Sequence, residues 1–197
     1  MYKTYIKRCI DVIVALTVFC IALPVFFAVS IAIRMDSKGP IIFKQKRLGK
    51  NGKVFTMYKF RTMVVNAEAG GVYSDNTDPR VTRVGRILRK TSLDELPQCI
   101  NILKGDMSLV GFRPPLTYHP WPFEQYSKKQ KKMFDLRPGI TGWAQVHGRK
   151  TVEWNRRIEY NIWYADNVSF LLDCKIILMT IFKVLKNEDN ENVGKTV

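Results

Sequence analysis

The stretch VIVALTVFCIALPVFFAVSIAI, residues 12–33, decides how this chain is organised. It contains no charged side chain and is interrupted by a single proline, Pro24. A helix of this length, rising about 1.5 Å per residue, would just cross a hydrocarbon core of about 30 Å. The stretch is therefore predicted to enter a membrane.

Two features argue against a simple crossing. Basic residues favour the cytoplasmic side, and they flank the stretch at both ends, so both ends are expected on the same side. Pro24 has no N–H group and clashes with the carbonyl of Cys20, so the helix is expected to break near its middle. The sequence therefore predicts a re-entrant, helix-break-helix membrane anchor over residues 1–36, kinked at Pro24. The flanking basic residues are Lys3, Lys7 and Arg8 on one side and Arg34, Lys38, Lys44, Lys46 and Arg47 on the other.

The charge of the chain indicates an anionic partner. Its formal net charge is +15, from 32 Lys and Arg and 17 Asp and Glu. Nucleic acid, an anionic leaflet or a phosphorylated substrate would each suit this balance. Because an intramembrane segment is attached, we expect membrane phospholipid and a phosphate-bearing substrate, and no nucleic acid. Only two histidines are present, which argues against a histidine-rich metal site.

Residues 37–197 are predicted to form a helix-rich α/β domain that faces the cytosol and carries interfacial helices. Its clearest element is a β-hairpin with strands over 41–46 and 54–61, because Asn51-Gly52 is a strong turn signal. Helices are expected over 81–90, 93–103, 151–166 and Phe170–Lys186, the last from its apolar stripe.

The sharpest local motif is Ser92-Leu93-Asp94-Glu95. As S-x-x-E it fits a capping box, with Ser92 as N-cap and Glu95 at the third helical position. It also fits a catalytic pair, because Arg89 and other basic residues just upstream are expected to lower the pKa of Asp94 and keep it nucleophilic. Adjacent helical side chains point about 100° apart, so Asp94 could attack a phosphate while Glu95 holds Mg²⁺. The residues alone leave both interpretations open.

Two arginines are held by rigid backbone. Arg113 precedes two prolines, and Arg137 precedes Pro138-Gly139. A rigidly mounted guanidinium suits bidentate binding of a phosphate, although a structural turn with a surface arginine would look the same.

An aromatic segment followed by lysines can be interpreted in two ways. Aromatic rings at headgroup depth and lysines on anionic lipid would make it interfacial, and the anchor favours this. The alternative is a core edge beside a solvated lysine run. The aromatic residues are Tyr118, Trp121, Phe123 and Tyr126, and the lysines are Lys128, Lys129, Lys131 and Lys132.

Five motifs, in this order, resemble those of the bacterial sugar transferase family, and within it the small monotopic polyprenyl-phosphate phosphoglycosyl transferases. The resemblance covers essentially the whole chain, including the apolar stretch. The motifs are Tyr58-Lys-Phe-Arg-Thr-Met63, Thr91-Ser-Leu-Asp-Glu-Leu-Pro-Gln98, Asn101-Ile-Leu-Lys-Gly-Asp-Met-Ser108, Arg137-Pro-Gly-Ile-Thr-Gly142 and Ala144-Gln-Val-His-Gly-Arg149.

The resemblance implies a re-entrant anchor, a cytosolic α/β catalytic part and a place on the cytoplasmic face of the bacterial inner membrane. It implies a ping-pong reaction in which Asp94 attacks the β-phosphate of a UDP-sugar and expels UMP. The covalent phosphosugar then passes to undecaprenyl phosphate and starts a glycan. The resemblance also makes Glu95 the Mg²⁺ ligand, and it makes Lys59, Arg89, Arg113 and Arg149 contacts to phosphate or nucleotide.

Some questions stay open at this point. A non-catalytic, membrane-anchored scaffold for anionic lipid or another polyanion would also explain the anchor and the charge, but not the acidic pair. The sugar of the donor can be an acetamido sugar such as diacetylbacillosamine or a plain hexose. Self-association is compatible with the sequence.

Overall fold

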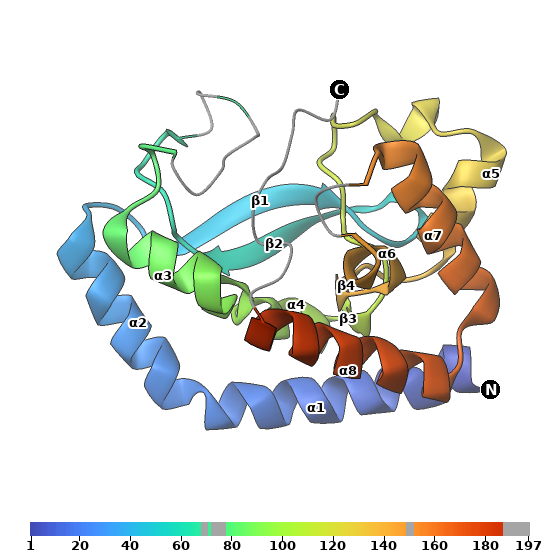
Figure 1. The fold of residues 1–197 in the computed structure, drawn as a ribbon, viewed down its shortest axis with the longest axis horizontal. Coiled ribbons are helices and arrows are strands. Elements are labelled where there is room, and N and C mark those ends of the chain that lie inside the picture. Colours follow the sequence, from blue (N-terminus) through green and yellow to red (C-terminus); the bar gives the residue numbers. More distant parts are fainter. Residues whose placement is uncertain (68–70, 72–77, 149–151, 187–197) are drawn as a thin grey trace.

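The computed structural model describes residues 1–67, 71, 78–148 and 152–186. The apolar stretch forms two helices that meet at a bend along one edge of the molecule (Figure 1). A short π-helical turn (Tyr2–Ile6) leads into α1 (Lys7–Ile21), and α2 (Leu23–Asp36) is bent away from it by 60°. Pro24 lies in the first turn of α2, where a helix needs no N–H donor, so the predicted break is present.

This bent pair has the length and composition of a membrane segment. Among the described residues, no single helix is both long and apolar enough to cross a membrane.

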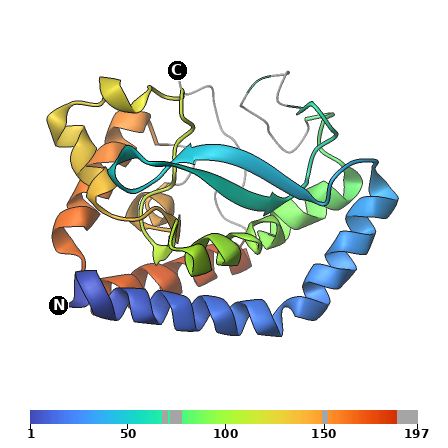
Figure 2. The same ribbon diagram turned by 180° about the vertical axis from the view of Figure 1, so that it is seen from behind.

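The remaining elements pack above the bent pair (Figure 1; Figure 2). α3 and α4 lie between it and a β-hairpin, α5 and α7 lie at the end of the molecule opposite α2, and α6 packs against α7 and α8. The strands are β1 (Ile42–Leu48), β2 (Val54–Phe60), β3 (Ser108–Val110) and β4 (Gly139–Thr141), and the helices are α3 (Arg83–Thr91), α4 (Gln98–Lys104), α5 (Lys128–Lys131), α6 (Trp143–Val146), α7 (Trp154–Asn167) and α8 (Phe170–Lys186).

The predicted hairpin is confirmed. β1 and β2 pair antiparallel from Ile42 opposite Phe60 to Leu48 opposite Val54. The turn contains Asn51 and Gly52 with φ values of 54° and 74°, the left-handed region that these two residue types tolerate best.

A second, parallel pair joins β3 to β4. A Cβ atom at Gly142 would collide with the carbonyl of Gly111, so only glycine allows this close approach. The segment that carries Arg113 follows β3 directly and is positioned by this pair.

The helix predicted over 93–103 is split, which corrects that expectation. A 3₁₀ turn (Leu93–Glu95) comes first, and α4 begins only at Gln98. Pro97 explains the break, because it has no N–H donor and restricts the residue before it. The other helices lie near their predicted ranges. α8 matches its range, and residue 151, where α7 was expected to begin, is outside the described residues.

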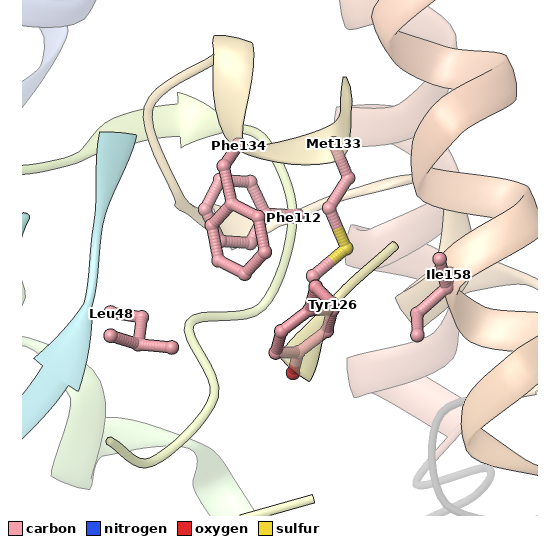
Figure 3. Packing of buried hydrophobic residues seen from close by; sticks show 6 residues of the cluster. All are labelled: Leu48, Phe112, Tyr126, Met133, Phe134 and Ile158. Carbon is pink, nitrogen blue, oxygen red and sulfur yellow. The ribbon is translucent and has the colours of Figure 1, made fainter. Parts of the chain in front are cut away.

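Three of the four aromatic side chains of the segment belong to a core, as Figure 3 shows for Tyr126. Tyr118 is 61% exposed, and an interfacial role for it and for the lysines stays a prediction. Tyr126 is only 2% exposed, and its ring meets that of Phe134 edge-on. Trp121 and Phe123 are half-buried against the same cluster. The core-edge interpretation is therefore the correct one for these three side chains, because neighbouring aromatic rings supply the apolar contact that lipid was expected to supply. The cluster consists of Leu48, Phe112, Tyr126, Met133, Phe134 and Ile158.

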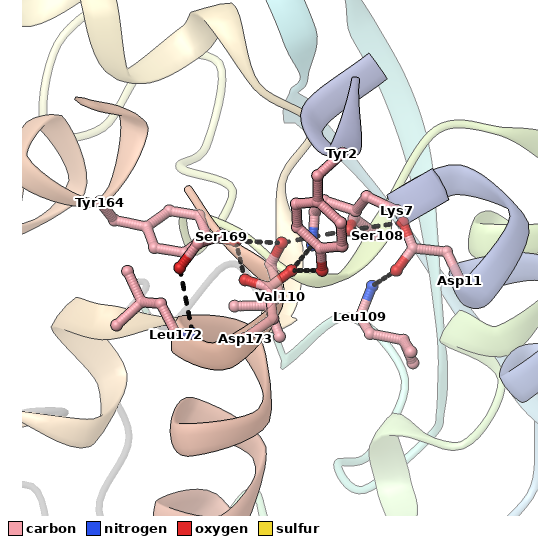
Figure 4. A network of polar contacts seen from close by, with 10 residues as sticks. All are labelled: Tyr2, Lys7, Asp11, Ser108, Leu109, Val110, Tyr164, Ser169, Leu172 and Asp173. Carbon is pink, nitrogen blue, oxygen red and sulfur yellow. Dashed lines mark hydrogen bonds and ion pairs between the residues drawn. The ribbon is translucent and has the colours of Figure 1, made fainter. Parts of the chain in front are cut away.

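Two buried carboxylates fasten α1 to the rest of the molecule (Figure 4). Asp173 at the start of α8 accepts hydrogen bonds from Lys7 Nζ at 2.7 Å, from the Tyr2 hydroxyl at 2.6 Å and from the Tyr164 hydroxyl. Asp11 accepts bonds from Ser108 Oγ at 2.7 Å and from a backbone N–H in β3 at 3.0 Å. Burial and the nearby Asp173 carboxylate raise the pKa of Tyr164, so its hydroxyl keeps its proton and acts as a donor.

The far end of the bent pair is fastened as well. Asp36, the last residue of α2, accepts a hydrogen bond from the backbone N–H of Val84 in α3 at 3.0 Å. Arg61 donates to the carbonyls of Ser37 and Lys38 at 2.8 and 2.6 Å. Both ends of the bent helix pair are thus bonded to the same folded body.

We expect Asp173→Asn to destabilise the protein by about 3 kcal/mol, because it leaves Lys7 buried without its counter-charge. The Lys7 and Asp173 side chains are only 10% and 7% exposed. The control is Asp166→Asn, in a surface pair with Lys132 at 2.7 Å whose side chains are 45% and 48% exposed, and where the change should stay below about 1 kcal/mol. Thermal unfolding in detergent measures both, and equal shifts would contradict the assignment.

Candidate active site

The acidic pair lies in the 3₁₀ turn that follows α3. Ser92 ends α3 in the left-handed region, with φ 57° and ψ 15°, and its side chain makes no capping hydrogen bond. The capping-box interpretation of S-x-x-E is therefore wrong. Ser92 instead reverses the chain so that Asp94 and Glu95 are presented to cations from other elements.

Two of these cations come from distant segments. Lys59 Nζ of β2 lies 2.6 Å from Glu95 Oε1 and 3.8 Å from Asp94 Oδ2. Arg113 Nη1, from the segment after β3, lies 3.5 Å from the same oxygen of Glu95. The Lys59, Asp94 and Glu95 side chains are 15%, 14% and 11% exposed, whereas that of Arg113 is 45% exposed. The structure thus brings together four of the residues predicted for the site, on a partly buried, charged surface that solvent reaches beside Arg113.

Arg89 contributes from α3. It is half-buried, its Nε donates to Thr62 Oγ1 at 3.0 Å, and its charge acts on Asp94.

Arg137, in contrast, donates to the carbonyl of Gly105 at 2.9 Å, at the carboxyl end of α4 where unpaired carbonyls attract a cation. The described contacts do not place Arg137 with the acidic pair, and its binding of substrate stays a prediction. Arg149 lies outside the described residues.

The pKa of Asp94 is shifted in the direction opposite to the expectation. Burial raises it, and the like charge of Glu95 adds to the rise, while Lys59, Arg113 and Arg89 oppose it without reversing the direction. The expectation counted the cations but not the loss of water. A carboxylate with a raised pKa is more basic than a solvated one, and the cations around it favour its ionised form.

The acidic pair fits a magnesium ion only with help from a substrate. Among the described residues, no group of three His, Cys, Asp or Glu side chains lies close enough to hold a metal. Mg²⁺ commonly binds one or two carboxylates and completes its coordination with substrate phosphates and water. Asp94 and Glu95 are compatible with such a site, and Glu95 is the candidate ligand.

The model of the bacterial sugar transferase family matches residues 2–187. The chain belongs to this family. The family predicted from the five motifs is therefore confirmed.

Relatives with assigned names support the same grouping. The sugar transferase EpsL of Bacillus subtilis is 43% identical over 93% of this chain and 89% of its own length. The UDP-glucose:undecaprenyl-phosphate glucose-1-phosphate transferase of Escherichia coli is 39% identical over 93% of this chain and 41% of its own length. An undecaprenyl-phosphate N-acetylgalactosaminephosphotransferase of Aeromonas hydrophila, which uses UDP-N-acetylgalactosamine by its name, is 40% identical over 92% of this chain and 44% of its own length. The chain thus spans less than half the length of these last two sugar transferases.

Sequence reasoning gave no role to Gln145 and Lys183, which line a cavity beside Glu95 in this family member. Gln145 lies inside one of the five motifs, which was a usable signal. Lys183 lies on the amphipathic α8, far from the acidic pair in the sequence and outside the five motifs. Nothing in the sequence therefore indicated that it lies near Glu95.

We expect Asp94→Asn to raise the thermal stability of the protein at neutral pH. An aspartate whose pKa is raised in the folded state destabilises that state when ionised, and the isosteric amide removes this cost. The gain in folding stability over the wild type should be full above the raised pKa and should shrink as the pH falls through it. It should vanish below about 3.9, the pKa of a solvated aspartate. A rise in Tm of about 2–4 °C would correspond to about 1 kcal/mol in a chain of this size.

The matched control is the exposed Asp135→Asn, which should change stability by less than about 0.5 kcal/mol. A lower Tm for Asp94→Asn at neutral pH would show that the cations outweigh burial at this position.

Proposed function

We propose that this chain transfers a sugar 1-phosphate from a UDP-sugar to undecaprenyl phosphate through a covalent intermediate on Asp94. The observation that carries the proposal is the adjacent pair Asp94 and Glu95, removed from most of the water and faced by Lys59 and Arg113. The names of the relatives from Escherichia coli and Aeromonas hydrophila support the class of donor and acceptor.

In the first step, an Asp94 carboxylate oxygen attacks the β-phosphorus of the UDP-sugar. The bond from that phosphorus to the oxygen bridging the two phosphates breaks, and UMP leaves with the electron pair. The reaction brings a negative nucleophile against a negative diphosphate, so positive charge fixed in advance lowers the barrier. Lys59 and Arg113, with Arg89 behind them, supply that charge.

In the second step, a phosphate oxygen of undecaprenyl phosphate attacks the phosphorus of the aspartyl intermediate. The Asp94 oxygen leaves with its electron pair, which regenerates the carboxylate and releases the sugar as a lipid-linked diphosphate. The product would open the assembly of a glycan. The two relatives differ in the sugar they are named for, so the proposal specifies the UDP part of the donor and leaves its sugar to be measured.

Glu95, together with oxygens of the donor diphosphate, would hold Mg²⁺, which would neutralise charge on the phosphates. Lys59, which now lies 2.6 Å from Glu95, would remain beside the phosphates as a second source of positive charge.

A non-catalytic scaffold is the weaker alternative. A scaffold that binds anionic lipid needs exposed cations, and it gains nothing from two adjacent carboxylates withdrawn from water. Burying such groups costs free energy, which is usually found where the groups do chemistry.

The anchor supports a place on the cytoplasmic face of the bacterial inner membrane. Apolar side chains of α1, α2 and α8 are exposed, among them Leu16, Phe27 and Leu178. A polyprenyl tail costs about 0.8 kcal/mol per CH₂ to withdraw from lipid, so an enzyme resting in one leaflet reaches the phosphate without extracting the tail.

Incubation with a UDP-sugar in the absence of acceptor should add the mass of a phosphosugar to the intact protein and release UMP. Asp94→Asn should give no adduct and lose about 10³-fold or more of the transfer activity, because the nucleophile is gone. The control Asp135→Asn should form the adduct normally. Intact-mass spectrometry over a panel of UDP-sugars checks this and identifies the sugar; an adduct that persists in Asp94→Asn would exclude the proposed nucleophile.

EDTA should abolish UMP release, and added Mg²⁺ should restore it. Glu95→Gln should lose activity while keeping its fold, because the neutral amide is a poor ligand for Mg²⁺. In the presence of UDP, Mg²⁺ should raise the Tm of the wild-type protein and leave that of Glu95→Gln unchanged. Full activity in EDTA would reject the role of the metal.

A further inference from the structure

A cavity of about 310 Å³ opens beside the acidic pair, between α1 and α8. Its polar end includes Ser92, Glu95 and Arg113. The rest of its lining is mostly aliphatic, and α1 contributes Ala15 and Val18 to one wall while α8 contributes Val184 to another. The cavity therefore joins the charged site to α1 and α8, both of which expose apolar side chains.

Gln145 supplies a second, independent sign of a ligand. This side chain of α6 lines the cavity and is only 8% exposed. Within the described residues, neither its amide nitrogen nor its amide oxygen has a hydrogen-bond partner. A buried amide without a partner destabilises the fold, so its presence here indicates a polar group that is supplied from outside the chain.

We propose that this cavity is the acceptor site: the first isoprene units of the polyprenyl phosphate lie between α1 and α8, and the Gln145 amide donates to its phosphate. The inference rests on the proposed function and assigns the second substrate to a place within it. The phosphate is the only polar group of this lipid. The cavity offers it polar side chains, including Gln145, Thr141, Thr180 and Lys183, beside the aliphatic ones that suit the isoprenoid chain.

The chemistry of the walls separates this occupant from the donor. A sugar or a uracil presents several donors and acceptors, each of which needs a partner when it is buried. The walls formed by Ala15, Val18 and Val184 offer none, whereas they give an isoprenoid chain apolar contact. Of the cations assigned to the donor diphosphate, Lys59 and Arg89 do not line this cavity, whereas Arg113 does, at the polar end where the two substrates must reach Asp94 in turn.

Filling the cavity should separate the two half-reactions. Val184→Trp adds a large ring to the cavity from a half-buried position, and Val18→Trp adds one from the α1 wall, where Val18 is 38% exposed. We expect exchange of labelled UMP into the UDP-sugar, which needs only the donor, to stay within about twofold of wild type. Transfer to undecaprenyl phosphate should fall at least tenfold, with a raised KM for the acceptor. The control is Leu185→Trp, next in sequence, 77% exposed and outside the cavity, where both rates should be unchanged.

Gln145→Leu provides a variant without added bulk. It should raise the KM for the acceptor about tenfold while leaving UMP exchange intact, and its Tm should not fall, because it removes an unpaired buried amide.

If either tryptophan variant lost exchange as fully as transfer while folded, the cavity would belong to the donor and the inference would be overturned. Retention of both activities in the tryptophan variants would overturn it as well. Absence of exchange in the wild-type protein would instead overturn the proposed function.

Discussion

The buried carboxylate of Asp173 is the constraint on which the placement of the N-terminal helix depends. A charge withdrawn from water requires an opposite charge and further donors, and Asp173 obtains them from Lys7, Tyr2 and Tyr164. These partners lie at opposite ends of the chain, so α1 cannot leave α8 without exposing unpaired groups. Asp11 repeats the arrangement one turn further along α1, against β3.

This attachment connects the bent helix pair to the candidate active site. Because α1 is held against α8 and β3, its Ala15 forms part of a cavity whose polar end contains Glu95 and Arg113. The far end of the bent pair is held too, through Asp36 and Arg61. The site itself works against stability, since Asp94 is buried beside the like charge of Glu95. Such a cost is common where a structure holds reactive groups ready, and the attachments elsewhere offset it.

Local signals in the sequence predicted the local parts of this structure. The Asn51-Gly52 turn predicted the hairpin, and the apolar stripe predicted α8. The motif around Asp94 and Glu95 indicated the acidic pair. The predictions that were wrong concerned features that depend on three-dimensional context. Ser92 has the right spacing for a capping box, but its left-handed backbone became visible only in the folded chain. Tyr126 looked interfacial because its partner Phe134 could not be paired with it from sequence alone.

The pKa of Asp94 was mispredicted for the same reason, since cations are readable in a sequence and desolvation is not. The central claim is that both ends of the bent helix pair are held by one folded body. We propose from this that the pair, when inserted in a membrane, enters and leaves it on the same side. Single cysteines at Lys3 and at Lys38, in a protein whose native cysteines are replaced by alanine, test this by labelling with a membrane-impermeant thiol reagent. The account predicts that both positions are labelled only from the cytoplasmic side. Labelling of the cysteine at position 3 from the periplasmic side, with that at position 38 cytoplasmic, would mean a true crossing and would contradict it.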